Sequence, residues 1–163
     1  MRLSLFTNYA LRTLMYLGHH PEQLITITEL ADYYGISRHH LIKVVHYLGK
    51  QDFINTTRGR GGGIALARPL DLINLRDVVM ACEKSSALIE CFDDEKNRCV
   101  ISESCRLKGA LHQAMSHFLR ELGRYTLADL LDQVAPCSMG GYPPHSFELN
   151  GVVPEIISGR KPL

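Results

Sequence analysis

Hydrophobic residues in the first fifty positions recur at helical spacing and predict three helices. A first helix over residues 3–18 is predicted by apolar residues at intervals of three and four: Leu3, Phe6, Ala10, Leu14 and Leu17. Thr26 and Glu29 fit the capping box S/T-x-x-E and begin a short second helix that ends at Gly35. A third helix capped by Ser37 carries a further apolar face: Leu41, Val44, Val45 and Leu48.

The next segment alternates between strand-like and turn-like composition. Residues 53–57 read as a strand, residues 58–63 as a glycine-rich turn and residues 64–67 as a returning strand. The second and third helices are joined by a short turn containing glycine, as in a helix-turn-helix. A helix-turn-helix followed by a β-hairpin predicts a winged helix, with the wing at about residues 53–68.

Helical spacing returns in the second half of the chain. Asn74 caps a short helix over 75–83, and Thr126 caps another over 127–134. Between them, a longer helix over about 106–123 has an apolar stripe: Leu107, Leu111, Ala114, Met115, Phe118 and Leu122. Core packing and a dimer seam explain this stripe equally well. The fold class is thus mainly α with a small β-hairpin wing, in one domain over 1–134. Residues 135–163 are rich in Pro and Gly, lack periodicity and are expected to be a flexible tail.

Composition and missing motifs argue against two classes of protein, membrane proteins and enzymes. The chain has 163 residues, 45% of them hydrophobic and 21% charged, with a net charge of +1, so any basic surface must be local. Polar residues interrupt the N-terminal apolar run, and no stretch reaches the roughly 18 apolar residues that a membrane span needs. We therefore expect a cytoplasmic protein with no membrane partner. No nucleotide-binding, metalloprotease or nucleophile-elbow motif is present, so an enzyme is not expected.

Two places in the predicted winged helix carry basic or hydrogen-bonding residues suited to DNA. The second helix of a helix-turn-helix enters the major groove with its N-terminal residues at the base edges. Here those residues are Ser37, Arg38, His39, His40 and Lys43. The wing tip adds Arg58, Arg60 and Gly61, suited to phosphate or minor-groove contact. A helix-turn-helix alone could be a plain structural corner, and exposed Arg and Lys alone could be merely solvated. Their combination with the wing favours double-stranded DNA as a partner.

Three cysteines, Cys91, Cys99 and Cys105, form a C-x7-C-x5-C pattern in an acidic segment. Thiolates bind zinc and iron–sulfur clusters. An odd total of five cysteines and a reducing compartment argue against a disulfide framework. The gaps of seven and five lack the short knuckles of zinc sites, although His112 could complete one with strain. Cys82 and Cys137 are expected to be bystanders. A zinc-stabilised module and a metal-free thiol switch stay open as alternatives.

Several segments together resemble the Rrf2 family of bacterial transcription regulators over about residues 1–134. They are TNYALRTLMYL, ISRHHLIKVVHYL, RGRGGGIALARP, the cysteine pattern followed by RLKGAL, and YTLADL. Within the family, the chain is similar to the nitric-oxide-sensitive repressors (NsrR) and the rhizobial iron regulators (RirA). The resemblance implies a homodimeric winged-helix repressor that binds a palindromic operator. It also implies a [4Fe-4S] or [2Fe-2S] cluster on Cys91, Cys99 and Cys105 in the loop 91–105, with 106–123 as the dimerisation helix.

Two departures from the family pattern concern the fourth cluster ligand. NsrR-like proteins can use an aspartate from the partner's first helix, where this chain has Asn8. The iron–sulfur biogenesis regulator of the family uses a histidine where this chain has Lys108, which cannot ligate while protonated. Asn8, water, a small thiol or another side chain could be the fourth ligand. The expected signal is accordingly nitric oxide, iron or redox state.

Overall fold

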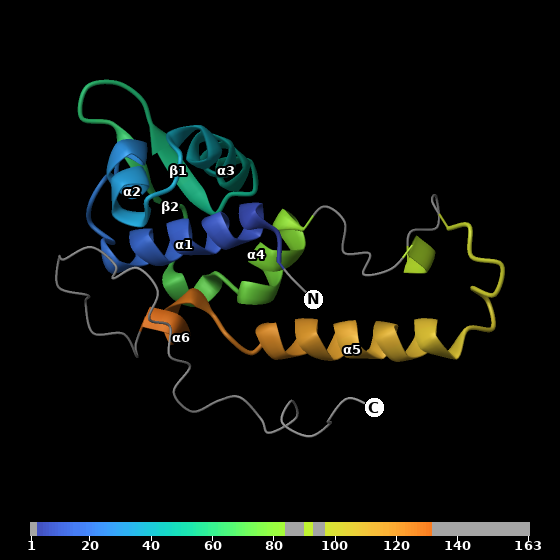
Figure 1. Ribbon diagram of the computed structural model, residues 1–163. Helices are drawn as coiled ribbons and strands as arrows, with labels where there is room; N and C mark the ends of the chain where they lie inside the picture. Colours follow the sequence, from blue (N-terminus) through green and yellow to red (C-terminus); the bar gives the residue numbers. More distant parts are fainter. Residues whose placement is uncertain (1–2, 84–89, 93–96, 132–163) are drawn as a thin grey trace, which may run out of the picture.

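The computed structural model describes residues 3–83, 90–92 and 97–131. Its elements follow in the order α1 (Leu5–His19), α2 (Ile27–Tyr34), α3 (Arg38–Lys50), β1 (Ile54–Thr57), β2 (Gly63–Leu66), a 3-10 helix (Leu70–Leu72), α4 (Leu75–Cys82), a 3-10 turn (Glu90–Phe92), α5 (Arg106–Leu122) and α6 (Leu127–Leu131). Helices α1 to α4, α6 and the hairpin pack together into one unit, the compact body (Figure 1). Helix α5 lies beside α4 at one end and extends away from that body (Figure 1).

Side-chain caps begin α1, α2 and α4, and the caps of α2 and α4 stand at the predicted positions, Thr26 and Asn74. The hydroxyls of Ser4 and Thr26 accept the backbone N–H groups of residues three further on, each at 3.1 Å. The amide oxygen of Asn74 accepts the N–H of Arg76 at 2.9 Å. Gly35 ends α2 in the left-handed conformation at φ 62°, which favours glycine. These local signals set the helix boundaries within the compact body.

The wing is a two-stranded antiparallel sheet. Its register pairs Ile54 with Leu66 and Thr57 with Gly63. The first strand, 54–57, therefore begins one residue later than predicted, and the second, 63–66, lies one residue earlier than predicted. Phe53 and Ala67 flank this register, and the N–H of Ala67 donates to the carbonyl of Phe53 at 3.0 Å. The N–H and carbonyl of Ile25 also pair with those of Ile64 at 3.0 and 2.8 Å, which joins the wing to the segment before α2.

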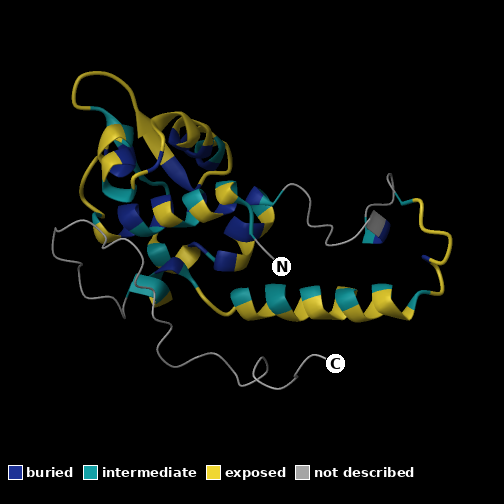
Figure 2. Cartoon of the chain, in the orientation of Figure 1, coloured by how far each residue is buried: buried dark blue, intermediate teal, exposed yellow. Residues whose placement is uncertain are grey.

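A single hydrophobic core holds the compact body together. Its fully buried members come from every helix of that body: Ala10, Leu14, Leu17, Ile25, Leu30, Leu41, Val44, Leu48, Ile73, Val78 and Leu127. In Figure 2 the dark blue of buried residues lies mainly in the compact body, whereas α5 carries only intermediate and exposed residues. The core fixes α3 and the wing relative to α1.

The predicted fold class, a mainly helical winged helix-turn-helix with a β-hairpin, is confirmed. Helix α5 ends at Leu122, one residue before the predicted boundary. The predicted last helix is seen over Leu127–Leu131, and the rest of it lies outside the described residues, as does the predicted tail 135–163. One local prediction is wrong. Ser37 stands at the start of α3, but its hydroxyl makes no capping hydrogen bond.

Candidate nucleic-acid interface and metal centre

Helix α3 has one face in the core and the other in solvent. Leu41, Val44, Val45 and Leu48 are buried against the rest of the compact body. His39 and Lys43 lie on the opposite face and are exposed, and Arg38 at the helix start is exposed as well. Because Gly35 ends α2 and Ile36 is buried, the turn holds α3 by its apolar face and presents its polar face outward. This is the geometry that a groove-reading helix requires.

Two further residues share the outward face and were missed by the sequence argument. Ile42 and His46 are exposed and lie three and seven positions after His39, which places them on the same side of α3. The prediction weighted the N-terminal residues of the helix. Continuing the spacing of His39 along the helix would have found both.

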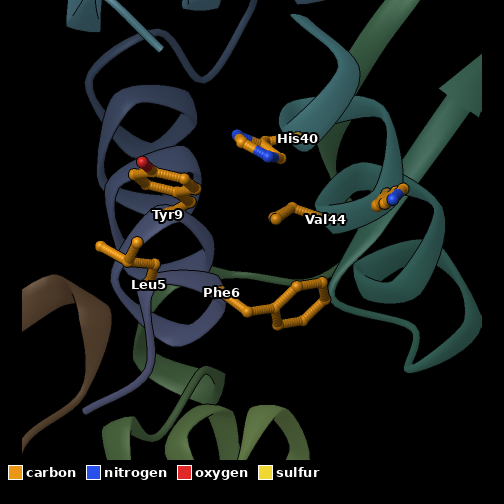
Figure 3. A pocket seen from close by; sticks show the side chains of 6 residues that line it. Leu5, Phe6, Tyr9, His40 and Val44 are labelled. Atoms are coloured by element: carbon orange, nitrogen blue, oxygen red, sulfur yellow. The ribbon is translucent and has the colours of Figure 1, made fainter. Parts of the chain in front are cut away.

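His40 has a different environment from its neighbour His39. Its ring stacks on Tyr9 of α1, with centroids 6.2 Å apart and an interplanar angle of 29°. Both rings line a small, mainly apolar hollow of about 120 Å³ between α1 and α3, with Leu5, Phe6, Lys43 and Val44 (Figure 3). The His40 side chain therefore lies at the edge of the outward face and against α1.

The wing tip depends on its glycines. Gly59 and Gly61 adopt φ values of 104° and 78°, which side chains strongly disfavour. A Cβ atom on Gly62 would lie 2.2 Å from the carbonyl oxygen of Thr57, so this turn closes only without a side chain. Arg58 just before Gly59 and Arg60 between Gly59 and Gly61 are both exposed. The tip is thus a narrow loop with two guanidinium groups and little other bulk.

The three predicted metal-ligating cysteines are all free thiols, but their exposure differs. Cys91 is buried, Cys105 is half-buried and Cys99 is exposed. Among the residues that the structure describes, no three His, Cys, Asp or Glu side chains lie close enough together to hold a metal ion. The trio is therefore present as a donor set and is not assembled into a site, and residues 93–96 between Cys91 and Cys99 lie outside the description.

Cys105 marks the junction between the cysteine segment and α5. Its sulfur accepts the backbone N–H of Lys108 at 3.4 Å and caps the helix. The Lys108 ammonium donates to the hydroxyl of Ser102 at 3.1 Å, and the Asn97 side chain donates to the same hydroxyl at 3.0 Å. These bonds organise residues 97–108 around the start of the helix.

The other candidate ligands each have surroundings of their own. Cys82 is buried in α4, and burial, followed by the charge of Glu83, raises the pKa of its thiol to about 11. It therefore stays protonated, as expected for a bystander. Cys137 lies outside the described residues. The ring of His112 meets the edge of Phe92 with centroids 6.0 Å apart, and Asn8 is exposed on α1.

A polar network joins the start of α1 to the end of α4. One carboxylate oxygen of Glu83 accepts the backbone N–H of Ser4 at 2.7 Å and the hydroxyl of Thr7. Burial alone would raise the pKa of Glu83, but the bonds from Thr7 and Ser4 outweigh it and lower the pKa below its usual value. Glu83 directly precedes the segment that leads to the cysteines, so the network fixes that segment's origin beside α1.

Helix α5 is amphipathic, and the described residues leave its apolar side only half-buried. None of its 17 residues is buried. Its half-buried apolar residues follow helical spacing on one face: Leu111, Met115, Phe118, Leu119 and Leu122. The predicted stripe residues Leu107 and Ala114 are exposed. Within residues 3–83, 90–92 and 97–131, core packing therefore buries none of this stripe.

The fold and the exposed face of α3 define the class of winged-helix regulators, and comparison with known proteins makes this specific. Residues 3–133 match the Rrf2 family model, whose description is an iron-dependent transcriptional regulator. The chain therefore belongs to the Rrf2 family of transcriptional regulators, and its relatives are not enzymes. No helix in the described part of the chain is long and apolar enough to cross a bilayer.

Individual relatives cover most of the chain. It is 45% identical over 132 residues to the HTH-type transcriptional regulator NsrR of Shouchella clausii, covering 80% of this chain and 89% of that protein. With the regulator of the same name from Geobacillus kaustophilus it shares 47% identity over 137 residues, covering 83% and 92%. The solved structure of T. potens IscR has the same fold, with a TM-score of 0.65 at 22% identity, covering 87% of this chain and 94% of that chain.

Proposed function

We propose that this protein is a DNA-binding transcriptional repressor whose operator affinity depends on an iron–sulfur cluster held by Cys91, Cys99 and Cys105. The observation that carries the proposal is the junction at Cys105, where one member of the thiol trio also caps α5. A change in the bonding of that sulfur acts directly on the helix start. The identity with regulators named NsrR supports nitric oxide as the signal and a cytoplasmic location.

The DNA contacts proposed are those of the outward face of α3 and the wing tip. Arg38 and Lys43 can donate to guanine edges, and His39 can bind a base edge or a phosphate. Ser37 is available because its hydroxyl is not used as a cap. His40, turned toward Tyr9, suits a phosphate at the groove edge. Arg58, Arg60 and the backbone at Gly61 complete the set at the wing.

Helix α5 is proposed as the seam of a homodimer. This 17-residue amphipathic helix has no buried residue, so its apolar stripe is only half-buried. A second copy of the same helix would cover the rest of the stripe. Sedimentation equilibrium of Met115→Glu, which places a carboxylate in the stripe, should give a monomer. Gln113→Glu adds the same charge on the opposite face and should stay dimeric. A dimeric Met115→Glu protein would contradict this seam.

The donor set fits the cluster chemically. Three free thiols are the soft ligands that iron–sulfur clusters use, and none is consumed by a disulfide. When bound, the cluster would supply reactive iron, and one position would be left to a weaker ligand such as Asn8. Bringing the three sulfurs together would order the segment from Cys91 to the start of α5.

The described contacts offer a route from that segment to the DNA-binding face. Glu83 fixes the origin of the segment to the start of α1, and the Tyr47 hydroxyl of α3 donates to the carbonyl of Ala81 in α4 at 2.5 Å. Helix α4 thus touches both α1 and the recognition helix. A coupling of roughly 1–3 kcal/mol along such contacts changes affinity 5- to 150-fold. The intact cluster is proposed to favour the binding geometry, and its loss to release it.

The test is operator binding by the full chain purified without oxygen. The protein should be brown, and native mass spectrometry should give the mass of a cluster. Chelation or nitric oxide should weaken binding at least fivefold, and Cys105→Ser should bind like the chelated protein. Cys137→Ser, which removes a cysteine outside the trio, should behave as wild type.

Other outcomes would replace the proposal. A colourless protein containing zinc would favour the zinc-stabilised module, and oxidant-dependent disulfides found by mass spectrometry would favour the thiol switch. Equal operator affinity of the loaded, chelated and nitric-oxide-treated protein would leave a repressor without cluster control.

A further inference from the structure

The outward face of α3 contains one apolar residue among polar ones. The exposed residues of this helix, all of which is described, are Arg38, His39, His40, Ile42, Lys43, His46 and Lys50. Every one of them except Ile42 can donate a hydrogen bond or carry a positive charge. Ile42 is 49% exposed.

Folding does not account for an isoleucine at this position. Ile42 is exposed outside the buried face formed by Leu41, Val44 and Val45. A β-branched residue also forms helix less readily than Lys, Arg or Gln, so it gains nothing in local stability. Single exposed hydrophobic residues are common on protein surfaces. What distinguishes Ile42 is its place in the middle of the face that the proposed function presents to DNA.

We propose that Ile42 determines sequence specificity by contacting the C5-methyl group of a thymine in the major groove. The inference rests on the proposed DNA-binding function. Thymine is the base that presents a methyl group in this groove, and apolar side chains are its usual partners. His39 and His46 lie on the same face, three positions before and four after Ile42, and can each hydrogen-bond to DNA beside that contact.

This contact differs in kind from the others proposed on α3. The charged and imidazole side chains can bind phosphates as well as bases, and phosphate contacts carry no sequence information. An isoleucine side chain has no donor or charge with which to bind a phosphate. Its contribution to affinity therefore appears only at operator positions with a methyl group, and it is lost when the methyl group alone is removed.

The experiment begins with an operator selected by the full wild-type chain from a pool of random double-stranded DNA. Each thymine of that operator is then replaced by deoxyuridine, which keeps the base pair and removes the methyl group. Fluorescence anisotropy with the wild type should show a loss of about fourfold at one position in each half-site, the factor expected from uncovering one methyl group.

Variants then assign that loss to Ile42. Ile42→Ala should bind the thymine and deoxyuridine operators equally, with the affinity that the wild type shows for deoxyuridine. Ile42→Val, which keeps a branched apolar side chain, should retain most of the discrimination. Leu72→Ala, a truncation of a 63% exposed leucine in the 3-10 helix after the wing, should discriminate as the wild type does.

The two levels of the proposal fail separately. A pool with no enriched sequence would overturn the proposed function and this inference with it. An enriched operator at which no thymine responds to deoxyuridine would overturn the inference alone, and this result needs no variant. A response that persists unchanged in Ile42→Ala would also overturn it, since another group would then contact the methyl.

Discussion

The compact body and helix α5 use hydrophobic residues of the same chain in opposite ways. In the compact body, apolar residues from α1, α3, α4 and α6 are buried together without solvent access. In α5, an equally regular apolar stripe buries none of its residues. The first region can fold from its own contacts. The second has no buried residue among those that the structure describes, which is why the proposed dimer seam lies there.

This difference matches the two roles in the proposed function, DNA binding by the compact body and sensing by the region that contains α5. A DNA-reading surface must be preorganised, and the core behind Leu41 and Leu48 makes α3 rigid. A sensor must exist in two arrangements of similar free energy, and a segment with few buried contacts is suited to that. The boundary between the two regions is the end of α4, where Glu83 bonds back to α1.

The largest expected effect contrasts one leucine from each region. In the monomeric Met115→Glu background, Leu14→Ala removes a fully buried side chain and should lower the free energy of unfolding by about 3 kcal/mol. Leu107→Ala removes a side chain that is 63% exposed on α5 and should cost less than about 0.5 kcal/mol. Urea unfolding measures both. Equal losses would mean that α5 belongs to the same core as α1.

The next effect is the response of each region to metal removal. Stripping iron from the anaerobically loaded protein should speed amide hydrogen exchange in the first turns of α5 by about tenfold, within the range of typical couplings. Exchange in α3 between Leu41 and Leu48 should change less than about twofold, because its protection comes from the core. Mass-resolved exchange of peptides from both helices gives the comparison. Equal acceleration in both helices would show that the two regions do not respond separately.

Sequence reasoning succeeded where structure is decided by neighbours along the chain. Thr26 with Glu29, Gly35 and Asn74 each act within four residues of their position, so their roles in the helix ends were predictable. The apolar faces of α1 and α3 were predictable for the same reason. The bond between Ser4 and Glu83 spans 79 residues and leaves no local pattern. It could be found only once the fold had placed α1 beside α4.

The candidate site was less predictable than the fold. Spacing identified Cys91, Cys99 and Cys105 as a candidate donor set, but within the described residues they do not form a group that could hold a metal ion, and no periodicity encodes the loop contacts between them. The outward residues Ile42 and His46 were accessible to helical spacing but were overlooked because they lie beyond the N-terminal turn. Proposed roles for the cysteines and the DNA-contacting residues therefore stand as hypotheses with the tests given above.

A smaller effect concerns the boundary between the regions. Glu83→Gln removes the charge that accepts bonds from Ser4 and Thr7 and should cost about 1–2 kcal/mol at pH 7. Because folding lowers the pKa of Glu83, this stabilisation is complete above the unfolded pKa of about 4.3 and disappears as pH falls through the folded value. Thermal unfolding of the metal-free wild type and variant should thus converge as the pH falls below the unfolded pKa of Glu83.

The matched control for this boundary is Glu103→Gln. Glu103 is exposed within residues 97–105, so removing its charge should leave both stability and its pH dependence close to those of the wild type. A constant difference between Glu83→Gln and the wild type across the acid range would show that the carboxylate charge does not anchor α4 to α1.

The smallest expected effect on stability separates folding from recognition inside the compact body. Thr26 and Ser37 both stand at helix starts, but only the Thr26 hydroxyl makes a capping bond. Thr26→Ala should therefore cost about 1 kcal/mol, and Ser37→Ala only a few tenths, in urea unfolding. If Ser37 instead contacts DNA, Ser37→Ala should weaken binding to the selected operator by about fivefold, the loss of one hydrogen bond. Thr26→Ala, which keeps α3 unchanged, should bind as the wild type does at temperatures where it is folded. A Ser37→Ala variant that loses stability but not operator affinity would reverse this assignment and return the hydroxyl to a capping role.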